Sequence, residues 1–334
     1  DVFGGVRRSV EAAQADMEAA IEDGRSVQVT LLGEVASNYI DLRGFQNQLA
    51  IARYNLKSQE DTLELTQARY KGGLSSGLDV ARAASQATDT ASRIPIIETS
   101  IKRATYRLGV LLGKDPSALA EELALGGPVP VSSTGVLPGL PSELLLRRPD
   151  IRRAERRLAS ATARIGVAKA DLYPHFNLTA LLGLQSSRAS NLFSSDSGVW
   201  QVVPGVSLPL FTGGRLTADI ESRNALQEQA LVSYRQTILA ALEEVEGSLE
   251  AYYKEQERLA SLVKVVEQDK LAADLANERY VKGLTGFIDV LDAQRSLYSS
   301  QGRLSQSEAA VSSNLVALYK ALGGGWETPE SPAK

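Results

Sequence analysis

The sequence predicts a mainly α-helical protein with a β part, in which long antiparallel coiled-coil helices carry one β-hairpin. Three observations predict this fold class. Helical sequence recurs at an offset of 210 residues, apolar residues occupy every seventh position over about five heptads, and the apolar period changes from about 3.5 to 2 in one segment.

The internal repeat is clearest in two glycine-rich stretches. Residues 69–80 read RYKGGLSSGLDV and residues 279–290 read RYVKGLTGFIDV. Each stretch lies between two long helical patterns, with Gly to end the first helix and an Asp near the start of the next. We therefore expect each to be the tip of a helical hairpin, so that the chain runs down and back twice.

The four helices of these hairpins are predicted from patterns rich in Ala, Gln, Glu and Leu. They cover about 6–70 and 78–112, with a bend expected at Pro95, and then 213–281 and 288–322. The apolar seam comprises Val35, Leu42, Leu49, Leu56, Leu63 and Tyr70 and, in the second copy, Val245, Tyr252, Leu259, Val266, Ala273 and Tyr280. Taken alone, such a seam also fits a structural coiled coil.

A loop and a shorter helix follow the first copy. The loop at 113–141 is rich in Pro and Gly and is expected to form a belt across the side of the long helices. The chain is thus divided into a first repeat at 1–112, beginning with the end of a strand hairpin, the belt at 113–141, an upper helix at 142–172, a β-hairpin at 173–211, a second repeat at 212–323 and a disordered tail at 324–334.

Arginines cluster at the start of the upper helix. They are Arg147, Arg148, Arg152, Arg153, Arg156 and Arg157. Such a cluster fits a solvated helix face with pairing to Glu155 inside the helix, and packing near the belt is the alternative.

Residues 173–211 carry the change of period. Apolar residues alternate with polar or small ones from Phe176 to Leu184 and again from Trp200 to Leu210, as on strands with one apolar face. The hairpin could pack on the molecule's own helices or cross a membrane, and aromatic residues at the strand ends favour the membrane. Two strands cannot close a barrel, so a membrane hairpin needs further strands from other copies of the chain.

Composition excludes several function classes. The chain has 334 residues, a formal net charge of −4, no Cys and a single His at 175, which removes disulfides, thiol nucleophiles and the usual zinc and haem sites. The balance of charge is not basic enough to suggest nucleic acid, and no apolar run is long enough for a transmembrane helix. The sequence has no catalytic triad or phosphate loop, so we expect no enzyme, no cofactor and no metal site.

Several segments together resemble the outer-membrane factor family, the TolC-like exit ducts of Gram-negative efflux and secretion systems. The resemblance is carried by both tip motifs and by LLRRPDI at 145–151, LPLFTGG at 208–214 and IDVLDAQR at 288–295. The LRRPD and DAQR stretches are similar to the lipoprotein subgroup that works with resistance-nodulation-division pumps in multidrug efflux. The resemblance covers essentially the whole chain.

This resemblance implies a homotrimer with a transmembrane β-barrel in the outer membrane and an α-barrel in the periplasm. It also implies a lipid-bearing Cys, an N-terminal helix and a first strand hairpin, none of which these residues contain. The implied function is a passive conduit for small molecules or drugs, with a periplasmic adaptor protein, an inner-membrane pump and outer-membrane lipid as partners. The expected adaptor-docking tips are Gly72, Gly73, Leu74, Ser75, Gly283, Leu284 and Gly286.

Two carboxylates follow the second tip. Asp289 and Asp292 are spaced i, i+3 and share a helix face, and in a trimer they would surround one axis and favour cations. The alternative is that Asp289 only complements the helix N-terminus and that Asp292 is solvated. By resemblance, the two align with carboxylates that line the family's periplasmic gate, and Ile288 is expected to add an apolar ring beside them.

The contacts that close this gate are also assigned by resemblance. Tyr280 aligns with a tyrosine of the bonds between inner and outer hairpins, and Asp79 aligns with its carboxylate partner. Thr285 stands where some members have an arginine. The closing contacts are therefore expected to differ here, with Arg295 as the substitute.

Three other functions remain open. The first is a secreted or cytosolic coiled-coil scaffold, and the second is an exit duct for type I protein secretion or metal efflux. A carboxylate-metal enzyme is the third, but it would need acids on facing helices, and the sequence has no Glu-x-x-His pair.

Overall fold

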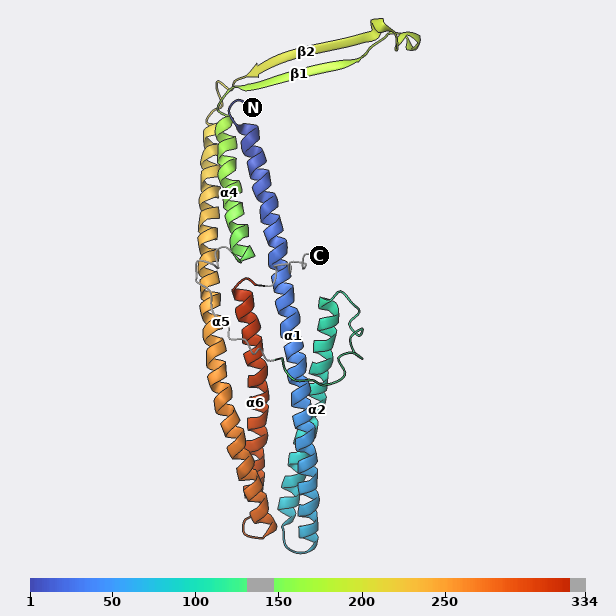
Figure 1. The fold of residues 1–334 in the computed structure, drawn as a ribbon, viewed down its shortest axis with the longest axis vertical. Helices are drawn as coiled ribbons and strands as arrows, with labels where there is room; N and C mark the ends of the chain where they lie inside the picture. The colour runs from blue at the N-terminus through green and yellow to red at the C-terminus, as the bar shows by residue number, and fades with distance from the viewer. Residues whose placement is uncertain (131–146, 325–334) are drawn as a thin grey trace, which may run out of the picture. The chain divides into compact units, whose positions relative to one another are not determined.

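The computed structural model describes residues 1–130 and 147–324. These fall into two units, one from Asp1–Ser26 and Leu145–Ala241 and the other from Val27–Leu144 and Leu242–Lys334. We call them the strand unit and the tip unit. Helices α1 (Gly5–Lys71) and α5 (Arg215–Val281) contribute residues to both (Figure 1).

The helices agree closely with the sequence patterns. Helices α1 and α5 have 67 residues each, while α2 (Gly77–Leu111) and α6 (Phe287–Ala321) have 35 each. Every bound of α5 and α6 lies 210 residues after the matching bound of α1 and α2, the offset seen in the sequence. Helix α2 continues on both sides of Pro95.

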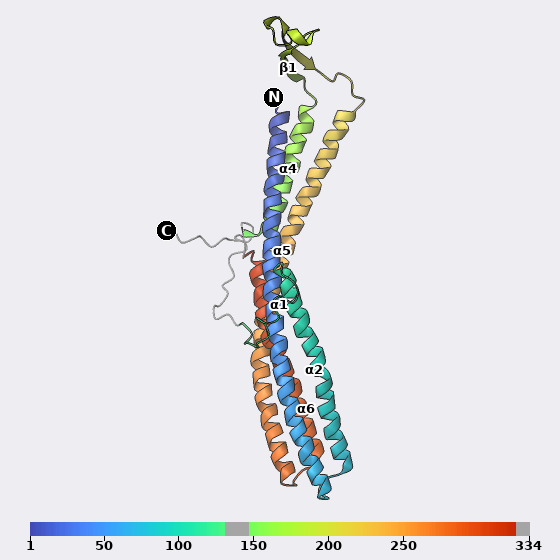
Figure 2. The same ribbon diagram turned by 90° about the vertical axis from the view of Figure 1, so that its right-hand side faces the viewer.

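In the tip unit, α6 lies beside both α1 and α5 (Figures 1 and 2). Asn47 of α1 donates a hydrogen bond to Ser305 of α6 at 3.2 Å, and Ser307 donates one to Glu255 of α5 at 2.5 Å. Part of the predicted apolar seam is buried, with Leu42 fully enclosed. The side of α6 that meets α1 is nevertheless polar, because buried Ser305 and Gln294 face the Asn47 and Thr62 side chains.

A buried amide also lies on α1. Gln59 of α1 is 1% exposed, and neither its Nε2 nor its Oε1 has a hydrogen-bond partner among the residues that the structure describes. Buried polar groups are normally paired, because an unpaired one costs about 1–3 kcal/mol. We call the α1–α6 contact, in which Asn47 meets Ser305 and Thr62 meets Gln294, the polar seam.

The described start of the belt packs on the tip unit. Leu119 is buried against Leu42 and Leu108, Gln46 donates to the Leu123 carbonyl at 2.7 Å, and Ser312 of α6 donates to the Pro130 carbonyl at 2.6 Å. Residues 114–130 therefore contact α1, α2 and α6. The rest of the predicted belt, the start of the upper helix at 142–146 and the tail from 325 lie outside the described residues.

In the strand unit, the arginines of α4 (Pro149–Ala170) do not form a merely solvated face. Arg152 lies 3.5 Å from Glu22 of α1, Arg156 lies 3.2 Å from Glu18, and Arg153 pairs with Asp23. The prediction of intrahelical pairing to Glu155 is confirmed for Arg156, which also contacts Glu155 at 2.5 Å. The solvated-face interpretation is therefore wrong, because acids spaced along α1 give these guanidinium groups partners on a second helix.

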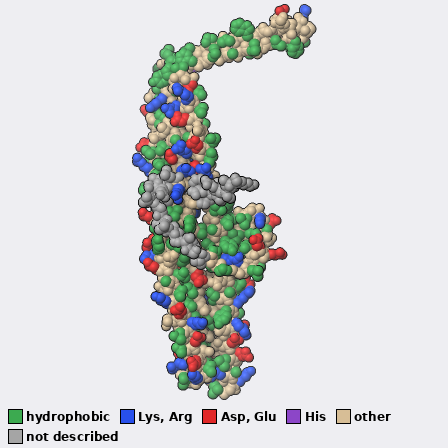
Figure 3. Space-filling model, viewed as in Figure 1, with side chains coloured by type: hydrophobic (Ala, Val, Ile, Leu, Met, Phe, Trp, Pro, Cys, Tyr) green, Lys and Arg blue, Asp and Glu red, His purple; other side chains and the backbone are tan. Residues whose placement is uncertain are grey.

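The β-hairpin consists of β1 (His175–Leu184) and β2 (Gly198–Ser207), paired antiparallel. The register places Phe176 opposite Val206, Leu178 opposite Pro204, Ala180 opposite Val202 and Leu182 opposite Trp200, so these side chains share one apolar face. Phe176 is 57% exposed and Leu182 is 88% exposed, and Figure 3 shows hydrophobic side chains along the hairpin surface. The alternative in which the hairpin packs on the molecule's own helices is therefore wrong.

Candidate functional site

The candidate site is the pair of hairpin tips at one end of the tip unit. Each turn ends its first helix with a glycine at positive φ, Gly73 at 73° and Gly283 at 72°. A residue with a side chain is strained there. Leu74 and Leu284 follow, and the backbone NH of each donates to the carbonyl oxygen of an arginine five residues earlier, at 2.8 and 2.9 Å.

Asp79 helps to cap the N-terminus of α2 and does not reach across to the second tip. Its carboxylate accepts from the Ser76 amide at 3.1 Å and from the Ser76 hydroxyl at 2.8 Å, while the Ser76 Oγ accepts from the Asp79 amide, which is a capping box. Partial burial opposes ionisation of this carboxyl. The hydrogen bonds from Ser76 and Ser75, with the charge of Arg82, outweigh that cost and hold the pKa of Asp79 below its usual value.

Tyr280 is the centre of the contact between the tips. It is 4% exposed, the Arg69 guanidinium carbon lies 4.6 Å from its ring centroid, and the Phe287 ring packs edge-on at 5.6 Å. Arg69 also donates to the Val281 carbonyl at 3.1 Å. The Tyr280 hydroxyl lies 3.5 Å from the Ser75 Oγ, and Ser75 in turn donates to Asp79 at 3.1 Å.

The predicted Tyr280–Asp79 pair is therefore indirect, because Ser75 stands between the two groups. Sequence reasoning missed Arg69. The signal was present in the Arg-Tyr dipeptide that opens both tip motifs, since an arginine one residue before a tyrosine in each tip can reach the ring of the other.

The other two predicted gate residues, Thr285 and Arg295, make different kinds of contact. Thr285 hydrogen-bonds to Asp289 of its own tip, so it is not a contact between hairpins in this chain. Arg295 does connect the hairpins, because its Nε donates to the Gln86 Oε1 of α2 at 2.8 Å. Beside it is a cleft of about 590 Å³ between α2 and α6, whose lining includes Asp89 and Tyr298.

The carboxylates of α6 lie on its open surface. Asp289 and Asp292 are both exposed, and Ile288 before them is 42% exposed. Asp289 is in the first turn of α6, whose N-cap Gly286 has no side chain to cap the helix. Asp289 can therefore stabilise the helix start and still face solvent, so the two interpretations of this residue do not exclude each other.

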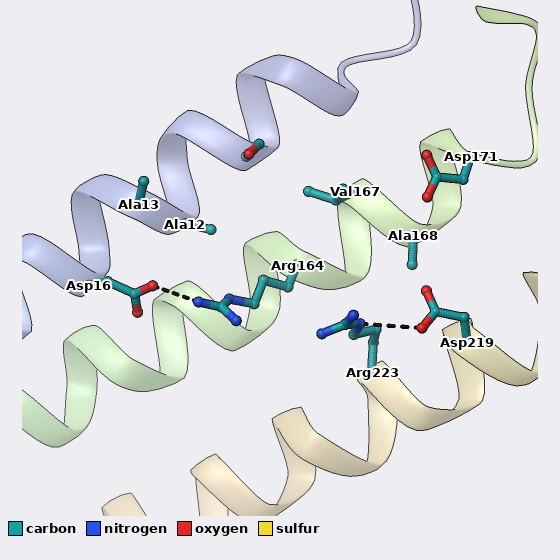
Figure 4. A pocket seen from close by; sticks show the side chains of 10 residues that line it. Ala12, Ala13, Asp16, Arg164, Val167, Ala168, Asp171, Asp219 and Arg223 are labelled. Carbon is teal, nitrogen blue, oxygen red and sulfur yellow. Dashed lines mark hydrogen bonds and ion pairs between the residues drawn. The ribbon is translucent and has the colours of Figure 1, made fainter.

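A second cluster of charges lies in the strand unit, in a pocket of about 320 Å³ (Figure 4). Four of its charged side chains form two ion pairs. Arg164 lies 2.7 Å from Asp16, and Arg223 lies 3.5 Å from Asp219. Burial opposes ionisation of Asp16, but hydrogen bonds from Ser160 and Arg164 outweigh it and lower the pKa. Such pairing is structural, and we assign this pocket no chemistry.

Two other kinds of functional element are absent from the described residues. Within residues 1–130 and 147–324, no three His, Cys, Asp or Glu side chains are placed to hold a metal ion. In the same part of the chain, no helix has the length and apolar content to cross a membrane.

Replacement of Asp79 by Asn is expected to loosen the first turns of α2. The loss of a charged capping group should lower the local opening free energy by about 1 kcal/mol at neutral pH. Because folding lowers the pKa of Asp79, its stabilisation is complete above the unfolded pKa of about 3.9. It disappears as the pH falls through the folded value. Hydrogen exchange of amides 80–86, corrected for intrinsic rates, measures this effect.

The matched control is Asp61→Asn, which removes an exposed carboxylate from α1. It should leave the exchange of amides 80–86 unchanged. An Asp79→Asn protein that exchanges like its parent at neutral pH would contradict the capping role.

Comparison with known proteins gives a consistent result. A model of the outer membrane efflux protein family matches residues 1–114 and 140–324. A Pseudomonas putida F1 protein named "Probable efflux pump outer membrane protein SepC" is 36% identical over 332 residues, which cover 99% of this chain and 68% of that protein. Nodulation protein T of Rhizobium leguminosarum bv. trifolii is 31% identical over 324 residues, 97% of this chain and 69% of that protein.

Solved structures agree with the sequence comparisons. The outer-membrane channel OprN superposes with a TM-score of 0.93 at 40% identity, covering 98% of this chain and 73% of that one. The outer membrane protein VceC of Vibrio cholerae has a TM-score of 0.89 at 29% identity, with 98% and 78% covered. The chain therefore belongs to the outer membrane efflux protein family, the outer-membrane exit channels of efflux systems.

Proposed function

We propose that three copies of the chain form a channel that passively conducts small molecules through the outer membrane. The observation that carries this proposal is the hairpin. Each strand has ten residues, enough to cross a bilayer when tilted, and the shared apolar face is exposed. In the described residues the sheet has only two strands, so each has an unpaired edge that lipid cannot satisfy. Strands of other copies would pair these edges.

The cargo is proposed from the names of relatives. These names refer to the efflux of toluene, the efflux of solvents and the export of pyoverdine. A duct that does not bind any single cargo tightly is consistent with all three names. The names also favour small molecules over the protein-secretion and metal-efflux alternatives. Energy and selection would then come from an inner-membrane pump, joined to the channel by a periplasmic adaptor.

Reconstitution tests this proposal. The full-length protein, added to a planar bilayer, should give uniform single-channel conductance and should run as a trimer in native mass spectrometry. As a control, heat-denatured protein at the same detergent concentration should give no channels. A full-length protein that is monomeric and soluble without detergent would support the coiled-coil scaffold instead.

We further propose that the channel is closed at the tips, by the contacts around Tyr280. Arg69 and Ser75 hold the tyrosine from the first hairpin, and Arg295 holds Gln86 a few turns away. Each contact joins residues more than 200 positions apart along the chain, so opening the tips requires each to break. Asp289 and Asp292 would then face the passing ions and favour cations.

The tips are also the proposed adaptor-docking surface. Leu74 is 70% exposed and Leu284 is 65% exposed, and each directly follows the positive-φ glycine of its turn. Exposed leucines at corresponding places in two turns are suited to apolar contact with a partner. Docking there would place the adaptor directly against the residues that hold Tyr280.

Replacement of both leucines by Asp is expected to weaken adaptor binding. Each buried leucine contributes about 1.5–3 kcal/mol, so the pair should cost at least tenfold in dissociation constant. Binding of the purified adaptor to full-length channel in detergent measures the effect. Replacement of exposed Leu239→Asp on α5 is the control. Unchanged affinity in the tip variant, together with unchanged channel conductance, would contradict the docking assignment.

A further inference from the structure

The contact at Tyr280 is built from two tips of one chain. The first tip supplies Arg69, 4.6 Å from the ring centroid, and Ser75, 3.5 Å from the phenolic oxygen. The second tip supplies the ring and the Val281 carbonyl that Arg69 binds. We call Arg69 and Ser75 the tyrosine socket of the first tip.

Each tip carries the residues for both roles. At the offset of 210, Arg279 and Thr285 repeat the tyrosine socket, and Tyr70 repeats Tyr280. The second socket is also built in the same way, because Thr285 bonds Asp289 just as Ser75 bonds Asp79.

The backbone repeats as well. Gly73 and Gly283 have φ values of 73° and 72°, and each donates its NH to a tyrosine carbonyl three residues earlier at 3.0 Å. The backbones that carry the arginine and the hydroxyl residue therefore turn in the same way in the two tips.

Only one of the two sets is filled within the chain. Tyr280 is 4% exposed and Tyr70 is 52% exposed. Arg279 is exposed, whereas Arg69 is half-buried over the Tyr280 ring. The chain thus holds one completed contact, one open tyrosine socket and one exposed tyrosine, and the last two are the complementary halves of the first.

A local difference accounts for part of this exposure. Phe287, which packs on Tyr280, has Gly77 as its counterpart, so Tyr70 lacks an aromatic neighbour from its own hairpin. The open arginine and hydroxyl of the second tip are not explained in this way, because both residue types are retained.

We infer that Tyr70 of one copy packs beneath Arg279 and beside Thr285 of the next copy. This inference rests on the proposed channel and specifies the contact that ties its subunits at the tips. Because each copy offers a tyrosine on one tip and a tyrosine socket on the other, the interface is head-to-tail, and such an interface forms a ring when the rotation between copies closes, as in the proposed trimer. Every tip in the assembly would then meet its neighbour through an arginine, a hydroxyl residue (Ser or Thr) and a tyrosine.

Cross-linking between tagged copies tests the contact. Full-length Tyr70→Cys with one affinity tag and full-length Arg279→Cys with another are co-expressed and treated with a short bismaleimide. Residues 1–334 contain no native Cys that could react with the bismaleimide. A product of two chains that carries both tags is expected, and neither version expressed alone should give any cross-linked product of two chains. As a matched control, Arg69→Cys with Tyr280→Cys in one chain should link within that chain and give no two-tag product.

A photoreactive phenylalanine analogue at position 70 keeps an aromatic ring there and provides a second measurement. The expected product joins position 70 to a peptide spanning 279–285 of a differently tagged copy. Trimeric, conducting channels without either product would overturn this contact while leaving the proposed function intact. A monomeric protein that does not conduct would overturn the proposed function and the contact together.

Discussion

Replacement of Arg69 by Ala is expected to raise the resting conductance of the reconstituted full-length channel several-fold. Arg69 makes two contacts with the second tip, one to the face of the Tyr280 ring and one to the Val281 carbonyl. A cation–π contact contributes about 0.5–2 kcal/mol, and a hydrogen bond from a charged donor contributes about 1.5–3 kcal/mol. Loss of both in each of three copies should shift the tips towards the open arrangement.

Single-channel recording at low voltage measures this effect. Arg103→Ala removes the same charge from an exposed site on α2 and should conduct like the parent. Tyr280→Phe should have a smaller effect than Arg69→Ala, because it removes only the 3.5 Å contact with Ser75 and leaves the ring beneath the guanidinium. Parental conductance in the Arg69→Ala channel would show that closure is maintained elsewhere.

Replacement of both Asp289 and Asp292 by Ala is expected to reduce cation selectivity several-fold. In a threefold assembly these exposed carboxylates would place six negative charges around one axis. In the described structure, neither carboxylate forms an ion pair with a Lys or Arg of its own helix. The reversal potential in a potassium chloride gradient should move towards zero. Block by added multivalent cations should weaken in parallel.

The control variant also removes two negative charges that are spaced i, i+3 on a helix. Glu243→Ala with Glu246→Ala removes two exposed acids spaced i, i+3 from α5, and its reversal potential should stay near that of the parent. If the Asp289→Ala, Asp292→Ala channel retained its selectivity, the carboxylates would not line the conducting path.

Local signals in the sequence predicted the elements well. Gly73 and Gly283 indicated the positions of the turns, because only glycine adopts their positive φ without strain. The predicted helix bounds lie within a few residues of those in the structure. The alternation from Phe176 gave the strands and their apolar face, because a period of two admits no helix. These signals depend on neighbours in the chain, which the sequence displays directly.

Contacts between distant segments were predicted less well. Both tips carry Arg-Tyr, so the sequence alone could not say that Tyr280 is buried and Tyr70 exposed. That distinction depends on which tip lies against the other. The arginines of α4 were assigned to Glu155 because it is near in sequence, whereas Glu18 and Asp23 lie more than 120 residues away. Tertiary pairing of charges leaves no periodic signal.

The polar seam between α1 and α6 bears on how the hairpins separate. Hydroxyl and amide groups such as Ser305 and Gln294 exchange their hydrogen bonds for bonds to water with a small net change in free energy, whereas apolar area costs about 25 cal/mol per Å² when it is wetted. Separation of the hairpins along the polar seam should therefore cost less free energy than separation nearer the tips, where Leu63 packs on the apolar cluster that contains Val290 and Leu291.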